Sequence, residues 1–256
     1  MRTNDASLTG FWTCSFLMFA ATTRDALSVV DPSLLKKAPS SIPSCLCLLH
    51  TPTASFWSPD NSFLYLSSAH TIHKYDSSSN TLKDVYTSDD TAAIRHLVAK
   101  DRSTVIFDTG DKIHVLECGS NPKVSQIFEA QKTSITSLSL SNDNTLLAST
   151  SASTVHVHNL TLGSHSVLRG LTLGGQDIKT SIFHPHCRTR LIVAAGKQIM
   201  IYDTTRPSGP LKTISLTEAA SGTISAIACS PFSKTLIAAA TSGGFVGLID
   251  LEKERA

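Results

Sequence analysis

The sequence has no apolar run long enough to cross a membrane and no block of like charge. The longest mostly apolar stretch, residues 11–21, falls well short of the roughly 20 residues that a membrane-spanning helix needs. Lysine and arginine number 22 and aspartate and glutamate 20, which leaves a formal net charge of +2. Basic pairs such as Lys36 and Lys37 are isolated. These absences argue against a protein that binds nucleic acid or a membrane surface.

Cysteine is sparse for a chain held together by disulfides. The six cysteines are spread along the sequence, at Cys14, Cys45, Cys47, Cys118, Cys187 and Cys229. A chain of 256 residues can bury a core without disulfides. Cys45 and Cys47 have no second pair at zinc-finger spacing. We therefore expect reduced thiols and a cytoplasmic protein.

Residues 11–21 leave one alternative to a cytoplasmic location. An apolar stretch that follows Arg2, with Ala20 and Ala21 where a peptidase would cut, is also the pattern of a secretory signal peptide. The repeat described below accounts for the same residues. A secreted protein is therefore the less favoured alternative.

The common sequence signatures of catalysis and cofactor binding are missing. There is no Gly-x-Ser-x-Gly nucleophile motif and no glycine-rich phosphate loop that leads into a helix. Serine and threonine are abundant, but a nucleophile also needs a base and a group that orients the base, and spacing shows neither. We expect a protein that is not an enzyme and binds no cofactor.

Two histidine groups could in principle ligate a metal ion. His156 and His158 are two apart, so in a strand both lie on one face. His184, His186 and Cys187 form a denser cluster. The polar face of an alternating strand accounts for the first group, and a turn that recurs elsewhere in the chain accounts for the second. We therefore predict no metal site.

A repeated unit runs through almost the whole chain. Each unit reads as a small or apolar strand, a tight turn, and an alternating strand that ends in an apolar or aromatic residue followed by a polar one. The closing pairs begin at residues 30, 75, 116, 158, 202 and 249, with spacings of 45, 41, 42, 44 and 47. Four of them are Val30-Asp31, Tyr75-Asp76, Tyr202-Asp203 and Ile249-Asp250. This period is typical of four-stranded propeller blades.

A second turn precedes most of these units. It reads Ser58-Pro-Asp-Asn61, Ser141-Asn-Asp-Asn144, His184-Pro-His-Cys187 and Ser230-Pro-Phe-Ser233. Proline fixes φ, while aspartate and asparagine side chains bond back to the backbone, so these segments favour turns between a first and a second strand.

These units together resemble the WD-repeat family, over roughly residues 16–250. The resemblance implies an all-β protein, a β-propeller of about six blade units, which we expect to be an incomplete seven-blade ring. We assign residues 1–14 to an N-terminal extension and residues 15–256 to the propeller. The sequence departs from the family because no closing pair reads Trp-Asp, and most of the His–Ser–Trp–Asp hydrogen-bond set of ideal repeats is absent.

The order of features adds a narrower resemblance. The chain opens on an apparent second strand, residues 15–22, so the first unit is expected to lack its first strand. This layout, with residues 174–180 and 218–222 before later units, is similar to that of the WD-repeat adaptors that target the γ-tubulin ring complex to centrosomes and spindle poles. The resemblance implies a scaffold at the microtubule-organising centre. In those adaptors a helical region, absent from this sequence, engages the γ-tubulin complex.

Other functions remain open because a fold does not choose a partner. They are an adaptor in a ubiquitin ligase, chromatin or trafficking complex, and less favourably a secreted propeller or a propeller hydrolase. For any adaptor we predict binding by the turns between second and third strands, since loops on a rigid scaffold carry recognition. The predicted residues are Ala69, His70, Gly110, Asp111, Gly196, Lys197, Gly243 and Gly244.

Overall fold

The structure, a computed structural model, describes residues 52–252 except 77, 80, 130, 170, 172–174, 207 and 217–220. It also describes the backbone of four short strands before residue 51. The described residues form strands and turns without a helix, so the all-β prediction is confirmed. Accordingly, no helix in this part of the chain could span a membrane.

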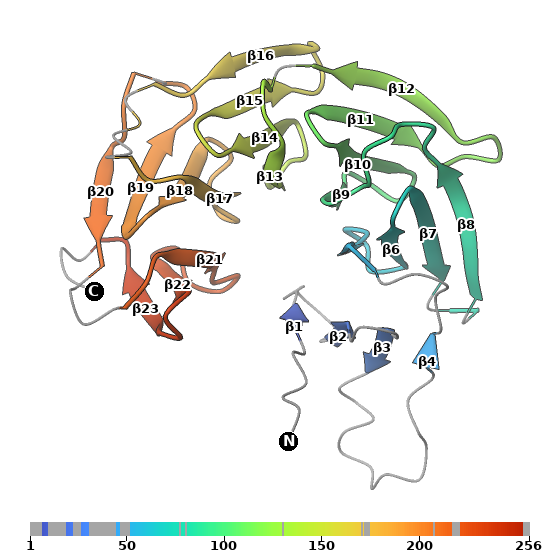
Figure 1. Cartoon of the computed structure of the whole chain (residues 1–256), viewed down its shortest axis with the longest axis horizontal. Coiled ribbons are helices and arrows are strands. Elements are labelled where there is room, and N and C mark those ends of the chain that lie inside the picture. The colour runs from blue at the N-terminus through green and yellow to red at the C-terminus, as the bar shows by residue number, and fades with distance from the viewer. Residues whose placement is uncertain are drawn as a thin grey trace, which may run out of the picture. The chain divides into compact units, whose positions relative to one another are not determined.

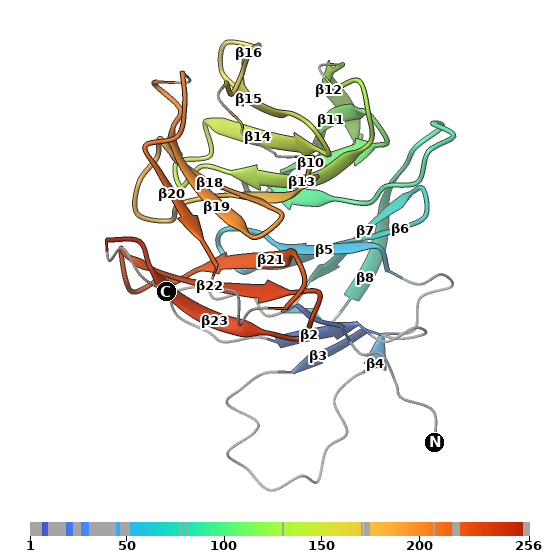
Figure 2. The same cartoon turned by 60° about the vertical axis from the view of Figure 1, so that its left-hand side comes forward.

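The strands form six antiparallel sheets in which consecutive strands pair as hairpins (Figures 1 and 2). The first three sheets comprise β1 (Ser7–Thr9), β2 (Phe19–Thr22), β3 (Leu27–Val30) and β4 (Cys45–Leu46); β5 (Ala54–Trp57), β6 (Phe63–Ser68), β7 (Thr71–Asp76) and β8 (Thr81–Thr87); and β9 (Leu97–Ala99), β10 (Thr104–Thr109), β11 (Lys112–Glu117) and β12 (Lys123–Phe128).

The other three sheets follow the same order. They comprise β13 (Ile135–Leu140), β14 (Leu146–Ser151), β15 (Val155–Asn159) and β16 (Ser164–Val167); β17 (Ile178–Phe183), β18 (Arg190–Ala195), β19 (Gln198–Asp203) and β20 (Lys212–Ser215); and β21 (Ile224–Cys229), β22 (Leu236–Thr241) and β23 (Val246–Asp250). Contacts divide the chain into two units, residues 1–109 with 114–126, and residues 110–113 with 127–256.

The closing pairs fall where the repeat predicts them. Each begins within the last two residues of the third strand of its sheet, from Val30 in β3 to Ile249 in β23. The four predicted turns at residues 58–61, 141–144, 184–187 and 230–233 join first and second strands. Six sheets therefore correspond to the six predicted units.

The first sheet corrects one expectation. The first unit was expected to lack its first strand, but Ser7–Thr9 pairs antiparallel with Phe19–Thr22 as β1. A three-residue strand is too short to show the alternation by which the other strands were found. The domain boundary at residue 14 stays a prediction.

The core of the second unit lies between the faces of successive sheets. Ile192, Ile199 and Ile201 of one sheet join Ile224, Ile237 and Ile249 of the next in a single buried cluster. Burying one such side chain contributes about 2 kcal/mol. Alternation along each strand supplies these residues, because every second side chain points to the same face.

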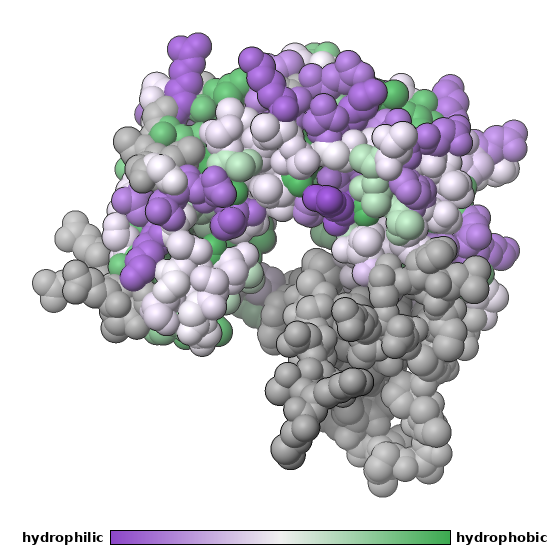
Figure 3. Space-filling model, viewed as in Figure 1, coloured by the Kyte–Doolittle hydropathy of each residue, from purple (hydrophilic) through white to green (hydrophobic). Residues whose placement is uncertain are grey.

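The last sheet differs from the others in having three strands. The side chains of Val246 and Leu248 in β23 are 72% and 67% exposed, whereas the next side chain, Ile249, is buried. One face of β23 therefore exposes apolar side chains. On the face in Figure 3, polar residues of the described part are mixed with scattered hydrophobic ones, and Leu162 and Phe232 are also exposed apolar side chains.

Candidate interaction surfaces

The eight residues predicted to bind partners all lie in turns between second and third strands. Ala69 and His70 join β6 to β7, and Gly110 and Asp111 join β10 to β11. The other turns are Gly196 and Lys197 between β18 and β19, and Gly243 and Gly244 between β22 and β23. Asp111 and Lys197 are exposed, while Gly196 is buried. The role of these residues in binding stays a prediction.

The backbone of these turns has a structural role that the sequence did not reveal. In four successive second-to-third-strand turns, three with predicted residues and the β14–β15 turn, the first carbonyl accepts a hydrogen bond from a buried isoleucine N–H at or just before the start of the next sheet. The pairs are Ala69 with Ile94, Gly110 with Ile135 and Ala152 with Ile178, each at 2.8 Å, and Gly196 with Ile224 at 2.7 Å. The backbone of these turns is therefore held by hydrogen bonds, while the side chains of Asp111 and Lys197 are exposed.

The hydrogen-bond set missing from the sequence is replaced by other polar pairs. In each pair a residue that precedes a sheet contacts the second strand of that sheet. The pairs are Thr53 Oγ1 with Ser67 Oγ (2.9 Å), Asp90 Oδ2 with Thr109 Oγ1 (2.8 Å), Gln131 Nε2 with Ser149 Oγ (3.0 Å) and Ser221 O with Thr241 Oγ1 (2.6 Å). The degenerate repeats thus keep a polar contact between the segment before each sheet and its second strand, but they make it with different residues.

Ser68, His73 and Asp84 form a chain of hydrogen bonds with the order of a hydrolase triad. Ser68 Oγ lies 2.6 Å from His73 Nε2, and His73 Nδ1 lies 2.7 Å from Asp84 Oδ1. Ser68 is 3% exposed and the side chain of Asp84 is 76% exposed. A hydrolase needs the opposite arrangement, with the serine open to substrate and the carboxylate buried. These residues therefore join β6, β7 and β8 and do not form a nucleophilic site.

His156 and His158 were expected on a water-facing side of their strand, and that expectation is wrong. Both side chains are buried, and His158 Nε2 lies 2.8 Å from Ser149 Oγ. Burial lowers the pKa of both, that of His158 to about 3. The His165 ring of β16 packs 5.5 and 5.6 Å from their rings. In the described part of the chain, no three such side chains are placed to hold a metal ion.

His184, His186 and Cys187 form the turn that the sequence predicted. The Cys187 N–H donates to the His184 carbonyl, and the His186 N–H donates to His184 Nδ1. His184 Nε2 then donates to the Lys234 carbonyl at 2.9 Å. Both ring nitrogens of His184 are committed to the turn and to the neighbouring sheet. Cys118, Cys187 and Cys229 are free thiols.

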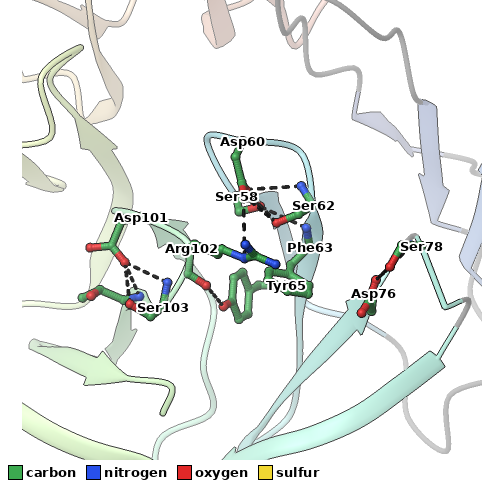
Figure 4. Close-up of polar contacts among 11 residues, drawn as sticks. Ser58, Asp60, Ser62, Phe63, Tyr65, Asp76, Ser78, Asp101, Arg102 and Ser103 are labelled. Carbon is green, nitrogen blue, oxygen red and sulfur yellow. Dashed lines mark hydrogen bonds and ion pairs between the residues drawn. The ribbon is translucent and has the colours of Figure 1, made fainter.

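The turn between β5 and β6 contacts the β9–β10 turn of the next sheet (Figure 4). The Ser58 hydroxyl donates to Asp60 Oδ1 at 2.6 Å and accepts from the Phe63 N–H at 3.0 Å. Asp60 Oδ2 lies 3.8 Å from Nε of Arg102, which is in the β9–β10 turn. The Lys74 ammonium lies 3.5 Å from the centre of the Phe63 ring, and Arg102 packs on the same ring at 5.0 Å. We call this set the Asp60 corner.

The equivalent corner between the sheets β13–β16 and β17–β20 is hollow. The Ser141 hydroxyl donates to Asp143 Oδ1 at 2.6 Å and accepts from the Leu146 N–H at 2.9 Å. Asp143 Oδ2 lies 2.8 Å from Arg188 Nε. A groove of about 410 Å³ opens beside this ion pair. We call it the Arg188 groove; its lining residues are Leu146, Val157, Asn159, Ser164, His165, Ser166, Arg188, Thr189, Thr204 and Thr205.

The Arg188 groove lies at the opposite ends of the strands from the predicted binding turns. Arg188 and Thr189 belong to a turn between first and second strands, and Thr204 and Thr205 follow a third strand. In a meander of hairpins these connections lie at the end away from the second-to-third-strand turns. The sequence prediction therefore did not include any residue of the groove.

Residues 122–159, which include β12 to β15, match the family model "WD domain, G-beta repeat". This segment is similar to one WD repeat. This chain is similar to a chain in a solved structure described as the mitotic checkpoint complex, with a TM-score of 0.71 and 18% sequence identity. The match covers 88% of this chain and 67% of the other chain. No protein of curated function matches the sequence. The fold is a WD-repeat β-propeller, as predicted, and among the described residues its last sheet has three strands.

A WD-repeat propeller is typically a non-catalytic fold that binds other proteins. Both kinds of surface described above suit that role. The second-to-third-strand turns present exposed side chains on a fixed backbone, and the Arg188 groove presents hydroxyl groups around a cation.

Proposed function

We propose that this protein is a WD-repeat scaffold that recruits γ-tubulin complexes to the microtubule-organising centre, and that it acts in the cytoplasm and at the centrosome or spindle pole. The WD-repeat fold supports the scaffold role. The specific partner rests on the resemblance in the order of repeat features to γ-tubulin-targeting adaptors. Partner docking would proceed by shape and hydrogen bonding, with no covalent step.

The observation that carries the scaffold role is the repeated bond between turn carbonyls and buried isoleucine N–H groups. Four successive turns are held by the same contact at 2.7–2.8 Å. A preorganised loop loses less conformational entropy on binding than a mobile one. Asp111 and Lys197 project from turns fixed in this way, so they are the side chains we expect to meet a partner first.

Capture of the tagged natural protein followed by mass spectrometry tests the partner. Subunits of γ-tubulin complexes among the captured proteins would support recruitment to the microtubule-organising centre. Cullin-adaptor subunits in their place would support the alternative role in a ubiquitin ligase, and γ-tubulin recruitment would then be wrong.

A double variant tests the surface. Asp111→Ala with Lys197→Ala should weaken capture roughly fivefold or more, because charged contacts at an interface centre cost over 1 kcal/mol when truncated. The matched control is Lys83→Ala with Glu117→Ala, which removes two other exposed charges outside these turns. Equal capture by both double variants would show that the turns do not bind the partner.

The division of labour in the resembling family gives a further test. If it holds here, this propeller directs location while a separate helical region binds the γ-tubulin complex. Purified residues 1–256 should then fail to bind γ-tubulin complexes directly. Tight direct binding would contradict this division while leaving the scaffold role intact.

A further inference from the structure

The Asp60 corner and the Arg188 groove are two versions of one structural frame. In each, a serine hydroxyl bonds to an aspartate two residues later and to the N–H that begins the second strand. In each, that aspartate faces an arginine in the first-to-second-strand turn of the next sheet. The frame fixes which residues are equivalent, so differences between the two places can be read one by one.

The groove exists because smaller side chains occupy equivalent positions. Phe63 corresponds to Leu146, since each begins the second strand directly after the turn. Lys74, opposite Tyr65, corresponds to Val157, opposite Ala148. In the Asp60 corner the ammonium of Lys74 and the guanidinium of Arg102 cover the Phe63 ring. Without the aromatic ring and the lysine, the space beside Arg188 is left as the groove.

The same comparison changes the charge of the site. Asp76, opposite Phe63, corresponds to Asn159, opposite Leu146. Both accept N–H groups of the following turn through Oδ1, so the turn is kept. The hydrogen bonds from Ser78 lower the pKa of Asp76 to about 2, which keeps that carboxylate ionised. Asn159 is neutral, so the carboxylates next to the groove are Asp143, paired with Arg188, and Asp203, which accepts the Thr205 hydroxyl at 2.7 Å.

Hydroxyl donors line the groove around its single cation. Ser164 and Ser166 lie opposite Asn159 and Val157, so both point to the groove side of β16. His165 between them points the other way, toward His158, and therefore lines the groove with its main chain. Thr204 and Thr205 complete the opposite wall, where the Thr205 hydroxyl already donates to Asp203 Oδ1 at 2.7 Å. The bond to Asp143 uses Nε of Arg188, and a guanidinium has four further N–H donors on its Nη groups.

We propose that the Arg188 groove binds a phosphorylated serine or threonine in an extended segment of a partner protein. A phosphate group offers three acceptor oxygens and nearly two negative charges, which match a guanidinium surrounded by hydroxyl donors better than a carboxylate would. Leu146 and Val157 supply an apolar floor for a neighbouring side chain. The volume lies within the range of small-ligand sites and holds a few residues. This site is separate from the turns of the proposed function and does not depend on that function being correct.

The test uses a fluorescent heptapeptide pool with a fixed central phosphothreonine, and the same pool without phosphate. Anisotropy of the full chain should show binding of the phosphorylated pool at least about tenfold tighter. Arg188→Gln should remove that preference, and Leu146→Phe, which places the ring of the Asp60 corner in the groove, should weaken binding without a change of charge. The matched control Arg102→Gln removes the equivalent arginine and should leave binding unchanged.

The variant Asp143→Asn tests whether Arg188→Gln loses binding only because the Arg188–Asp143 ion pair is broken. It keeps the cation and removes its competing carboxylate, so the phosphorylated pool should bind as tightly as before or more tightly. Equal binding of the two pools, or full binding by Arg188→Gln, would overturn the proposal. So would a loss of binding in Arg102→Gln equal to that in Arg188→Gln.

Discussion

The Asp60 corner and the Arg188 groove show how one repeat can serve for stability in one sheet and for recognition in another. Both keep the serine–aspartate turn and the arginine of the next sheet. The first is filled by Phe63 with two cations over its ring, and the second leaves about 410 Å³ beside its arginine. The hydrogen-bonded frame is therefore independent of what fills it, so the filling residues can vary without loss of the turn.

Truncation of the filling residue should separate the two places most strongly. Phe63 is 9% exposed and packs under two cations, so Phe63→Ala should lower the free energy of unfolding by about 3 kcal/mol. Leu146 is half-buried at the edge of a groove, so Leu146→Ala should cost about 1–2 kcal/mol. Urea unfolding measures both. Equal losses would show that Phe63 does not fill its corner as described.

A second difference between the same two sheets should appear as sensitivity to acid. Tyr75, opposite Leu64, corresponds to His158, opposite Leu147. The folded pKa of His158 is about 3, below its ordinary value of 6.5, so the unfolded chain takes up the proton first as pH falls. Stability is unaffected above about pH 6.5 and declines below it, by about 2 kcal/mol at pH 5.

His158→Tyr, which installs the residue of the other sheet, checks this cause. The variant should show a flatter decline of unfolding free energy between pH 7 and pH 5, even if its stability at pH 7 is lower. His186→Tyr is the control, because His186 is exposed in a turn. A steep decline that persists in His158→Tyr would assign the acid sensitivity to other groups, His156 first among them.

The features that the sequence predicted well depend on local bonds and on a regular period. The closing pairs and the first-to-second-strand turns each rest on residues within five positions of one another, such as Ser58 with Asp60 and Phe63. Pattern reasoning recovers such contacts because the residue types themselves favour the turn. Ser7–Thr9 was missed because three residues carry no readable alternation.

The groove and the buried histidines depend on contacts that spacing does not show. Val157 matters because it stands where Lys74 stands in another sheet, and that equivalence requires the strand register. His158 is buried because packing covers both faces of β15, including the Phe128 ring at 4.9 Å from its own. An alignment of the repeats against one another, anchored on the Ser-x-Asp turns, would have exposed both the Phe63-to-Leu146 and the Asp76-to-Asn159 changes.

Loss of the serine hydroxyl should affect the two places equally. Ser58 and Ser141 are both buried, and each satisfies a strand N–H and a carboxylate at matching distances. Ser58→Ala and Ser141→Ala should each lower the free energy of unfolding by about 1–2 kcal/mol, because a backbone N–H loses its partner. Chemical denaturation of the two variants gives the comparison. A cost in one variant at least twice that in the other would mean that the frames are not equivalent.

Removal of the arginines should have the smallest effect on stability and no difference between the two places. Arg102 is 69% exposed and Arg188 55% exposed in their side chains, so water screens both ion pairs. Exposed pairs contribute roughly 0–1 kcal/mol, and we expect Arg102→Gln and Arg188→Gln to fall within about 0.5 kcal/mol of each other. Thermal and urea unfolding at low and high salt would measure this. If Arg188→Gln leaves stability intact but abolishes phosphopeptide binding, then Arg188 serves binding and not folding. A loss of 2 kcal/mol or more in Arg188→Gln alone would instead make that arginine a structural residue, and the contrast between the filled corner and the groove would then concern packing only.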